Sequence, residues 1–173
     1  MLESARVARP SDQSAMVGLA GEAIQELSPM RGGQLWANTL GRTSPLDASF
    51  LLDSEDPTTF MVVGCIDEVV VGYGVVRLQA MTDGQNLGVI SDLFTHPDAR
   101  GVGIGELMMK LVVEWCQERG CIGVDAVALP GNRETKNFFE TFGLKARAII
   151  VHRSLTSDAD EPRTAEGDAH ITM

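Results

Sequence analysis

The feature that most constrains this chain is an amphipathic segment that follows a run of alternating glycines. Its apolar residues recur at offsets of 0, 3, 4, 7, 8, 11 and 12 from the first, a spacing that places them on one face of a helix. These residues are Ile104, Leu107, Met108, Leu111, Val112, Trp115 and Cys116. Gly120 follows them, where a left-handed cap commonly ends a helix. The spacing therefore predicts a helix that begins near Ile104 and ends before Gly120.

The entry to this helix, which we call the glycine loop (residues 100–105), has the composition of an anion-binding site. Glycine lets the backbone approach a ligand closely, and the first N–H groups of a helix have no partner within it. With the positive end of the helix dipole, these groups suit a phosphate or a pyrophosphate. A dinucleotide fingerprint would need glycine where Glu106 stands, and a P-loop would need Lys-Ser/Thr after Gly105. Glycine at a helix start can also have a purely structural role. The flanking motifs must therefore decide whether the glycine loop binds an anion.

Composition excludes several classes of function. A length of 173 residues, with 44% hydrophobic and 22% charged residues, predicts one globular domain. No apolar run approaches the ~20 residues of a membrane span, and the first residues lack a signal-peptide core, so a cytoplasmic protein is expected. A net charge of −10 argues against nucleic-acid binding and is compatible with a cationic substrate or simply with solubility. Three cysteines without CxxC spacing predict buried free thiols and no metal site.

The remaining pattern predicts an α/β chain with a mixed sheet and helices on both faces. Strands are expected over 5–9, 59–66, 69–79, 87–95, 121–129 and 145–155, and helices from Ser11 to Leu27, over 34–40, around 44–52 and from Asn132 to Gly143. This order differs from a doubly wound sheet. Residues 156–173 carry five acidic residues against one arginine and few apolar ones, which predicts a disordered tail.

Motifs on both sides of the glycine loop carry a family resemblance. Residues 92–97 read Asp-Leu-Phe-Thr-His-Pro, and the loop itself fits Arg-x-x-Gly-x-Gly. Residues 132–144 place Asn, Thr, Phe-Phe and Gly-Leu at the spacing N-x-x-A-x-x-F-Y-x-x-x-G-F. Together these motifs resemble those of the GNAT superfamily of acyl-CoA N-acyltransferases. The resemblance covers residues 5–155 and implies a GNAT fold for a domain over 1–155.

The resemblance implies acetyl-CoA as cosubstrate, with no metal. The backbone N–H groups of the glycine loop and of Glu106 would bind the pyrophosphate. The backbone of 93–95 would pair with the pantetheine arm between strands that splay apart. An N–H near Leu93 would polarise the thioester carbonyl. Lys136 would meet the adenosine phosphates or remain a solvated lysine. The cofactor residues so expected are Leu93, Phe94, Thr95, Arg100, Gly101, Val102, Gly103, Ile104, Gly105, Glu106, Asn132, Lys136 and Phe139.

The implied reaction is direct attack by a neutral amine on the thioester in a ternary complex, which requires removal of a proton from the ammonium form. Asp92 is the first candidate base and His152 the second, and each has a structural alternative. Many members have a proton-donating tyrosine where this chain has Phe139, and we expect Tyr73 to be a wall residue. The acceptor is left open among a small amine, an aminoglycoside-like polyamine, an amino acid and a peptide N-terminus. Acidic residues that could attract it are Glu26, Asp47, Asp53 and Asp56.

Two alternatives to this scheme follow from departures from the family pattern. Without a tyrosine at position 139, the chain could be a CoA-binding regulatory or interaction domain that has lost catalysis. Many members also end in a two-stranded hairpin, whereas this chain has one candidate strand after its last helix. The missing strand would be absent or supplied by a partner, which makes a homodimer a further expectation.

Overall fold

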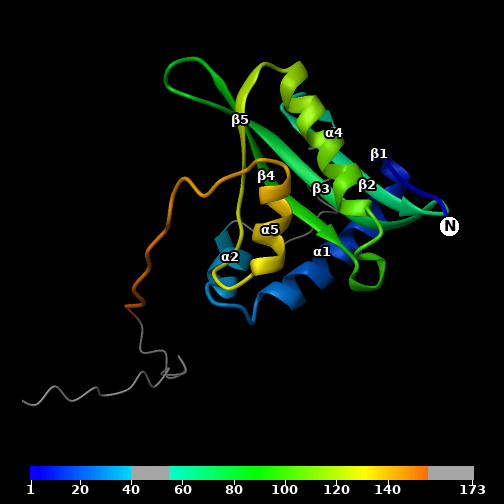
Figure 1. Cartoon of the computed structure of the whole chain (residues 1–173), viewed down its shortest axis with the longest axis horizontal. Coiled ribbons are helices and arrows are strands. Elements are labelled where there is room, and N and C mark those ends of the chain that lie inside the picture. Colours follow the sequence, from blue (N-terminus) through cyan, green and yellow to red (C-terminus); the bar gives the residue numbers. More distant parts are fainter. Residues whose placement is uncertain (40–54, 156–173) are drawn as a thin grey trace, which may run out of the picture.

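A five-stranded sheet organises the computed structural model, which describes residues 1–39 and 55–155 (Figure 1). The strands lie side by side in chain order as β1 (Glu3–Val7), β2 (Thr59–Ile66), β3 (Val69–Ala80), β4 (Asn86–Thr95) and β5 (Cys121–Ala126). Neighbouring strands are antiparallel from β1 to β4, and β5 runs parallel to β4. The sheet is therefore mixed, as the sequence predicts.

Helices cover both faces of this sheet, and each face has its own core. On one face, α1 (Gln13–Leu27) buries apolar residues such as Met16 and Leu19 against β2, β3 and β4, with α2 (Gly33–Thr39) beside it. On the other face, α4 (Ile104–Glu118) packs across the sheet and α5 (Arg133–Thr141) adds Phe139. Single turns of 3-10 helix, η1 (Pro10–Asp12) and η2 (Pro97–Ala99), precede α1 and follow β4. None of the helices in this described part of the chain combines the length and apolar content needed to cross a membrane.

Local sequence signals account for the best-defined elements. Asp67 and Glu68 have φ angles of 46° and 69°, the left-handed pair that a two-residue β-hairpin turn requires, and they join β2 to β3. Gly120 ends α4 with a φ of 66°, and Gly143 follows α5 with a φ of 80°. Asn132 caps α5 by accepting a hydrogen bond from the Thr135 N–H at 3.1 Å. The predicted ends of α4 and α5, before Gly120 and Gly143, are confirmed.

The predicted last strand is wrong. Residues 145–155 form neither a helix nor a strand, and all of them are exposed. A strand needs a neighbouring strand to pair its N–H and C=O groups, and nothing in the described residues pairs with this segment. The element order therefore ends at α5.

Smaller corrections concern element boundaries. Strand β5 stops at Ala126 and does not reach 129. The helix predicted from Ser11 begins at Gln13, because Ser11 lies in the 3-10 turn η1 that precedes the α-helix. The helix expected around 44–52 and the tail 156–173 lie outside the described residues.

Candidate active site

The glycine loop joins the end of β4 to the start of α4, and its backbone explains two of its glycines. Gly101 and Gly103 have φ angles of 77° and 91°, in the region that side-chain-bearing residues rarely adopt. A Cβ atom at either position would meet no atom within 4 Å, so the backbone conformation, not crowding, calls for glycine. Gly103 is the N-cap residue of α4, and within the described residues no side chain caps this helix start. The first N–H groups of a 15-residue helix are thus left for a ligand.

A cavity of about 440 Å³ opens beside this helix start, between the carboxyl ends of β4 and β5. The two parallel strands are paired up to Ile90 and Ala126, after which β4 continues to Thr95 while β5 ends. The strands therefore separate where the family resemblance requires them to. Eleven of the predicted site residues line the cavity: Asp92, Leu93, Phe94, Thr95, Arg100, Gly101, Ile104, Gly105, Glu106, Asn132 and Phe139.

Asp92 is a buried carboxylate on this cavity, with a side chain held by two hydroxyl groups. Its exposed fraction is 7%. The Tyr73 hydroxyl donates to Oδ1 at 3.2 Å, and the Ser91 hydroxyl donates to Oδ2 at 2.6 Å. Tyr73 reaches it from β3, on which Val75 lies opposite Asp92 just before a register irregularity. A buried carboxylate with fixed donors has the orientation that proton transfer to a bound substrate needs.

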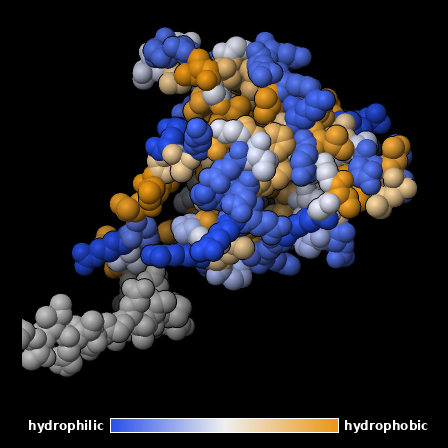
Figure 2. Space-filling model, viewed as in Figure 1, coloured by the Kyte–Doolittle hydropathy of each residue, from blue (hydrophilic) through white to orange (hydrophobic). Residues whose placement is uncertain are grey.

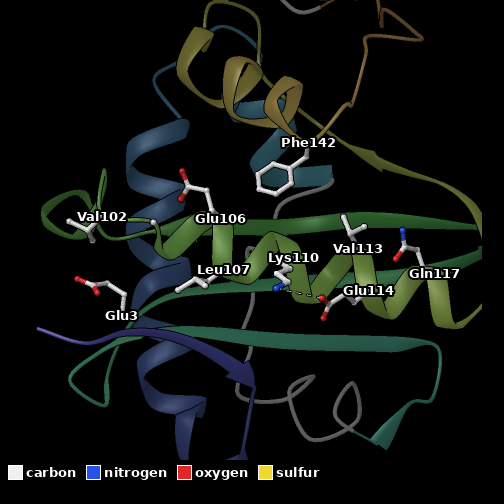
Figure 3. Close-up of a pocket in the computed structure, with 10 residues that line it drawn as sticks. Glu3, Val102, Glu106, Leu107, Lys110, Val113, Glu114, Gln117 and Phe142 are labelled. Carbon is white, nitrogen blue, oxygen red and sulfur yellow. Dashed lines mark ion pairs between the residues drawn. The ribbon is translucent and has the colours of Figure 1, made fainter.

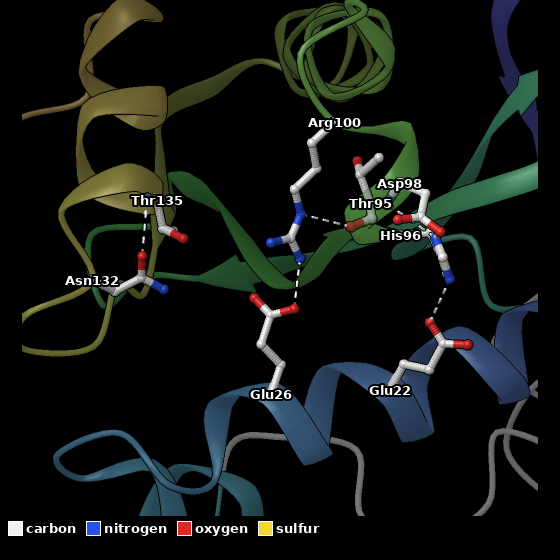
Figure 4. A network of polar contacts seen from close by, with 8 residues as sticks. All are labelled: Glu22, Glu26, Thr95, His96, Asp98, Arg100, Asn132 and Thr135. Atoms are coloured by element: carbon white, nitrogen blue, oxygen red, sulfur yellow. Dashed lines mark hydrogen bonds and ion pairs between the residues drawn. The ribbon is translucent and has the colours of Figure 1, made fainter.

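Arg100 connects the glycine loop to α1 on the opposite face of the sheet (Figure 4). Its Nε donates to the Thr95 carbonyl at 3.0 Å and its Nη2 donates to the Glu26 carboxylate at 2.7 Å. The guanidinium also lies 5.4 Å from the centre of the Phe94 ring. The charge of Glu26 is therefore paired with Arg100, which weakens the expectation that Glu26 attracts an amine.

A second contact between the same elements lies one turn earlier on α1. His96 Nε2 lies 3.6 Å from a carboxylate oxygen of Glu22, and His96 Nδ1 accepts a hydrogen bond from the Asp98 N–H at 3.2 Å (Figure 4). Neither Glu22 nor His96 lines the cavity. The α1 helix thus contacts the segment after β4 at two places, of which only the Glu26–Arg100 contact borders the cavity.

Other predicted site residues lie elsewhere. His152 is in the exposed segment 145–155 and does not line the cavity with Asp92. Lys136 is exposed and pairs with Glu140 at 2.5 Å. Of the acidic residues expected to attract an amine, Asp56 accepts hydrogen bonds from Thr58 in a turn before β2 and does not line the cavity. Asp47 and Asp53 lie outside the described residues.

Val102 and Gly103 line a different hollow, an open groove of about 920 Å³ along the outer surface of α4 (Figure 3). Glu106 borders both hollows, and Lys110 and Glu114 lie 4.0 Å apart across one turn of helix within the groove. The groove holds neither Asp92 nor Tyr73. The buried Asp92 and its Tyr73 partner therefore line the smaller cavity.

Sequence reasoning missed several residues of this cavity. Tyr73 was expected only as a wall residue, and its hydroxyl contact with Asp92 depends on strand register, which no local pattern encodes. Met30 and Trp36 line the side of the cavity toward α1 and α2, and Phe138 lines the side toward α5. Phe138 sits so close to the glycine loop that a Cβ on Gly105 would lie 3.1 Å from its ring. A side chain at position 105 would thus crowd the Phe138 ring.

Comparisons with known proteins agree with this geometry. Residues 31–144 match the sequence profile of the Acetyltransferase (GNAT) family. A thialysine N-epsilon-acetyltransferase of Bos taurus is 31% identical over 75 residues, which are 43% of this chain and 44% of that protein. The chain thus spans less than half the length of the curated relatives that it matches.

Solved structures resemble this one in fold. A glucosamine-6-phosphate N-acetyltransferase from Arabidopsis thaliana superposes with a TM-score of 0.67 at 17% identity, over 90% of this chain and 100% of that one. An aminoglycoside N-acetyltransferase in complex with CoA superposes with a TM-score of 0.67 at 13% identity, over 87% and 98%. At such identities the likeness establishes the α+β mixed-sheet fold alone.

Proposed function

The chain belongs to the acetyltransferase (GNAT) family, and from that premise we propose that it transfers an acetyl group from acetyl-CoA to a primary amine by direct attack in a ternary complex. The observation that carries the proposal is one cavity with three features: the uncapped start of α4, the separated ends of β4 and β5, and the buried Asp92. We assign residues 1–155 to this domain and 156–173 to an acidic tail.

The residues present suit acetyl-CoA. The backbone N–H groups of the glycine loop and of Glu106 would hold its pyrophosphate, because these groups lie at the positive end of a helix dipole. Beyond Ile90, no strand among the described residues pairs with 93–95 on the β5 side, so this backbone would pair with the pantetheine arm. Arg100 would act by holding the loop in place, since its guanidinium already binds Glu26 and the Thr95 carbonyl. Asn132 and Phe139, which line the cavity, would complete the cofactor side.

Asp92 is the proposed general base, and Tyr73 and Ser91 are positioning residues that fix its carboxylate. Asp92 takes a proton from the ammonium form of the acceptor. The neutral amine nitrogen then bonds to the thioester carbonyl carbon, the C–S bond breaks, and the second nitrogen proton is released to solvent. Phe139 has no proton to give, so the sulfur departs as the thiolate. A thiol has a pKa near ~8.5, so its thiolate is a competent leaving group near neutral pH.

The acceptor site would lie on the side of the cavity lined by Met30, in the turn between α1 and α2, and by Trp36 of α2. An acidic chain with Asp92 at the bottom of the cavity supports a cationic acceptor: a small amine, an aminoglycoside-like polyamine, an amino acid or a peptide N-terminus. The relatives named for thialysine, aminoglycoside and glucosamine-6-phosphate support an amine in general. Three free cysteines support a reducing compartment, so we place the protein in the cytoplasm. We also propose that it is a homodimer.

Release of CoA from acetyl-CoA, detected as free thiol across a panel of these acceptors, tests the proposal. We expect release that depends on one acceptor class. Asp92→Asn should lower kcat about 10²-fold or more, because it removes the base that takes the ammonium proton. Asp83→Asn, which changes an exposed carboxylate in the turn between β3 and β4, should leave kcat unchanged.

The alternative is a CoA-binding regulatory or interaction domain, which Phe139 favours because it cannot donate a proton. Acetyl-CoA binding without CoA release for any acceptor would support that alternative. Absence of acetyl-CoA binding would overturn both.

A further inference from the structure

Two of the three free cysteines lie together where α4 ends and β5 begins. Cys116 is in the last turn of α4 and is 1% exposed, and Cys121 is the first residue of β5 and is half-buried. Both pack in the apolar cluster between α4 and the sheet, whereas Cys65 belongs to the cluster on the other face. Cys116 and Cys121 therefore form a pair of thiols, and Cys65 is separate from them.

The pairing of β4 with β5 brings the two side chains to the same part of the sheet. Cys116 lies over Gly88 of β4, where a Cβ would be 2.5 Å from the cysteine Sγ. Cys121 is the partner of Asn86, which is two residues before Gly88 on the same strand. The absence of a side chain at Gly88 thus lets the Cys116 thiol reach the sheet beside Cys121.

The two thiols interact, and they differ in how readily an oxidant reaches them. Burial, and then the charge and the side-chain hydrogen bond of Cys121, raise the pKa of Cys116 to about 12. Cys116 therefore keeps its proton and is a poor nucleophile toward a dissolved oxidant, since the thiolate is the reactive form of cysteine. Cys121 is the more exposed sulfur, and residues 117–120 beside it are all exposed. Figure 2 shows hydrophilic residues, in blue, at the top of the view, where α4 ends in Figure 1. A polar oxidant in water should thus reach Cys121 first.

We propose that Cys116 and Cys121 are a redox modification site, at which hydrogen peroxide converts the two thiols into a reversible disulfide. The Cys121 sulfur attacks one peroxide oxygen, the O–O bond breaks, and the products are a sulfenic acid on Cys121 and one water. The Cys116 sulfur then bonds to the Cys121 sulfur, the S–O bond breaks, and the oxygen leaves with the Cys116 proton as a second water. The two thiols together lose two electrons and two protons, and the peroxide is reduced to water.

Proximity makes Cys116 the partner in the second step. A sulfenic acid condenses with a neighbouring thiol, and a thiol held beside it by the fold has a high effective concentration. Thiol reductants return the disulfide to two thiols, so in a reducing compartment the bond forms only in response to an oxidant. The bond joins the end of α4 to the start of β5, two elements whose opposite ends flank the cavity.

Trypsin offers a direct test, because it cuts after Arg119, between the two cysteines. The full chain is treated with hydrogen peroxide, its remaining thiols are blocked, and it is then digested. Peptides 111–119 and 120–133 should stay joined in the mass spectrum and should separate when a reductant is added. The number of thiols that can be titrated in the denatured chain should fall from three to one. Peptides that separate without reductant, or a bond to Cys65 or between two chains, would overturn the proposal.

Matched variants separate the roles of the two thiols. Cys116→Ser should stop the reaction at the sulfenic acid on Cys121, which dimedone labels, whereas Cys121→Ser should leave Cys116 unlabelled. Cys65→Ala removes the cysteine on the other face of the sheet and should leave the cross-link unchanged. Labelling of Cys116 in the Cys121→Ser chain would contradict the order of the two steps. None of these measurements depends on acetyl transfer, so this proposal and the proposed function fail separately.

Discussion

At the residue scale, Asp12 is a buried carboxylate that ties the start of α1 to β1. Arg6 donates to both of its oxygens, at 2.6 and 2.9 Å, and the Arg9 N–H donates at 2.7 Å. The hydrogen bonds from Arg6 hold the pKa of Asp12 below its usual range. A lowered pKa in the folded protein stabilises it above the pKa of the unfolded chain, near ~3.9, and this contribution is lost as the pH falls through the folded pKa.

Asp12→Asn should therefore lower the free energy of unfolding at pH 7 by about 1–3 kcal/mol, because Arg6 and the Arg9 N–H lose a charged acceptor. The difference from the wild type should shrink as the pH falls below about 4. Urea unfolding at a series of pH values measures both effects. Asp98→Asn, at a side chain that is 94% exposed, is the matched control and should have little effect. A constant difference across the series would show that Asp12 acts without its charge.

Some residues of the site could be predicted from the sequence, and one important contact could not. Asp92 and Asn132 were predicted because the motifs around them are local, and both line the cavity. The partner of Asp92 could not be predicted, since Tyr73 reaches it through the register of β3 against β4 and a bulge between Val75 and Val76. Register is set by packing over the whole sheet.

At the element scale, close packing of α4 on β4 depends on Gly88. A Cβ at this position would lie 2.5 Å from Sγ of Cys116, whose burial raises its pKa to about 12 and keeps it a neutral packing group. Gly88→Ala should cost about 1–3 kcal/mol of stability through overpacking. Cys116→Ala in the same chain should recover much of that loss, because it removes the atom that the new methyl group strikes.

A double-mutant cycle from denaturant unfolding gives this coupling, expected at about 0.5–3 kcal/mol. Gly123→Ala, on the neighbouring β5, is the control, since its Cβ would meet Leu87 at an ordinary 3.5 Å. Losses that add without coupling would mean that Gly88 is needed for its backbone alone.

Elements with a local sequence signal were predicted correctly. The structure of segment 145–155, which depends on a neighbouring strand, was not. Helix α4 has its periodicity and its terminal glycine, and the β2–β3 hairpin has its turn pair. Residues 149–151 are as β-branched as parts of β2, yet they are a strand only if another strand pairs with them. Local composition cannot tell a paired strand from an unpaired one.

At the scale of the whole molecule, α1 and α4 lie on opposite faces of the sheet, and the Arg100–Glu26 ion pair joins them around the end of β4. Both side chains are 32% exposed, and such partly exposed pairs contribute about 0.2–1 kcal/mol. Because Arg100 also holds the Thr95 carbonyl, the pair fixes the path of the glycine loop. The acceptor side of the fold is thereby connected to the proposed pyrophosphate site.

Glu26→Gln should loosen the glycine loop, since the amide keeps a hydrogen-bond acceptor but loses the charge that attracts Arg100. Hydrogen exchange of residues 100–105 should become faster, a result that needs no ligand. Acetyl-CoA affinity, measured by calorimetry, should fall about 1.4- to 5-fold, the equivalent of the ion pair. Glu22→Gln is the matched control on the same helix, because it weakens only the 3.6 Å contact with His96, outside the cavity. If both variants changed exchange and affinity equally, α1 would act through its general packing and not through Arg100.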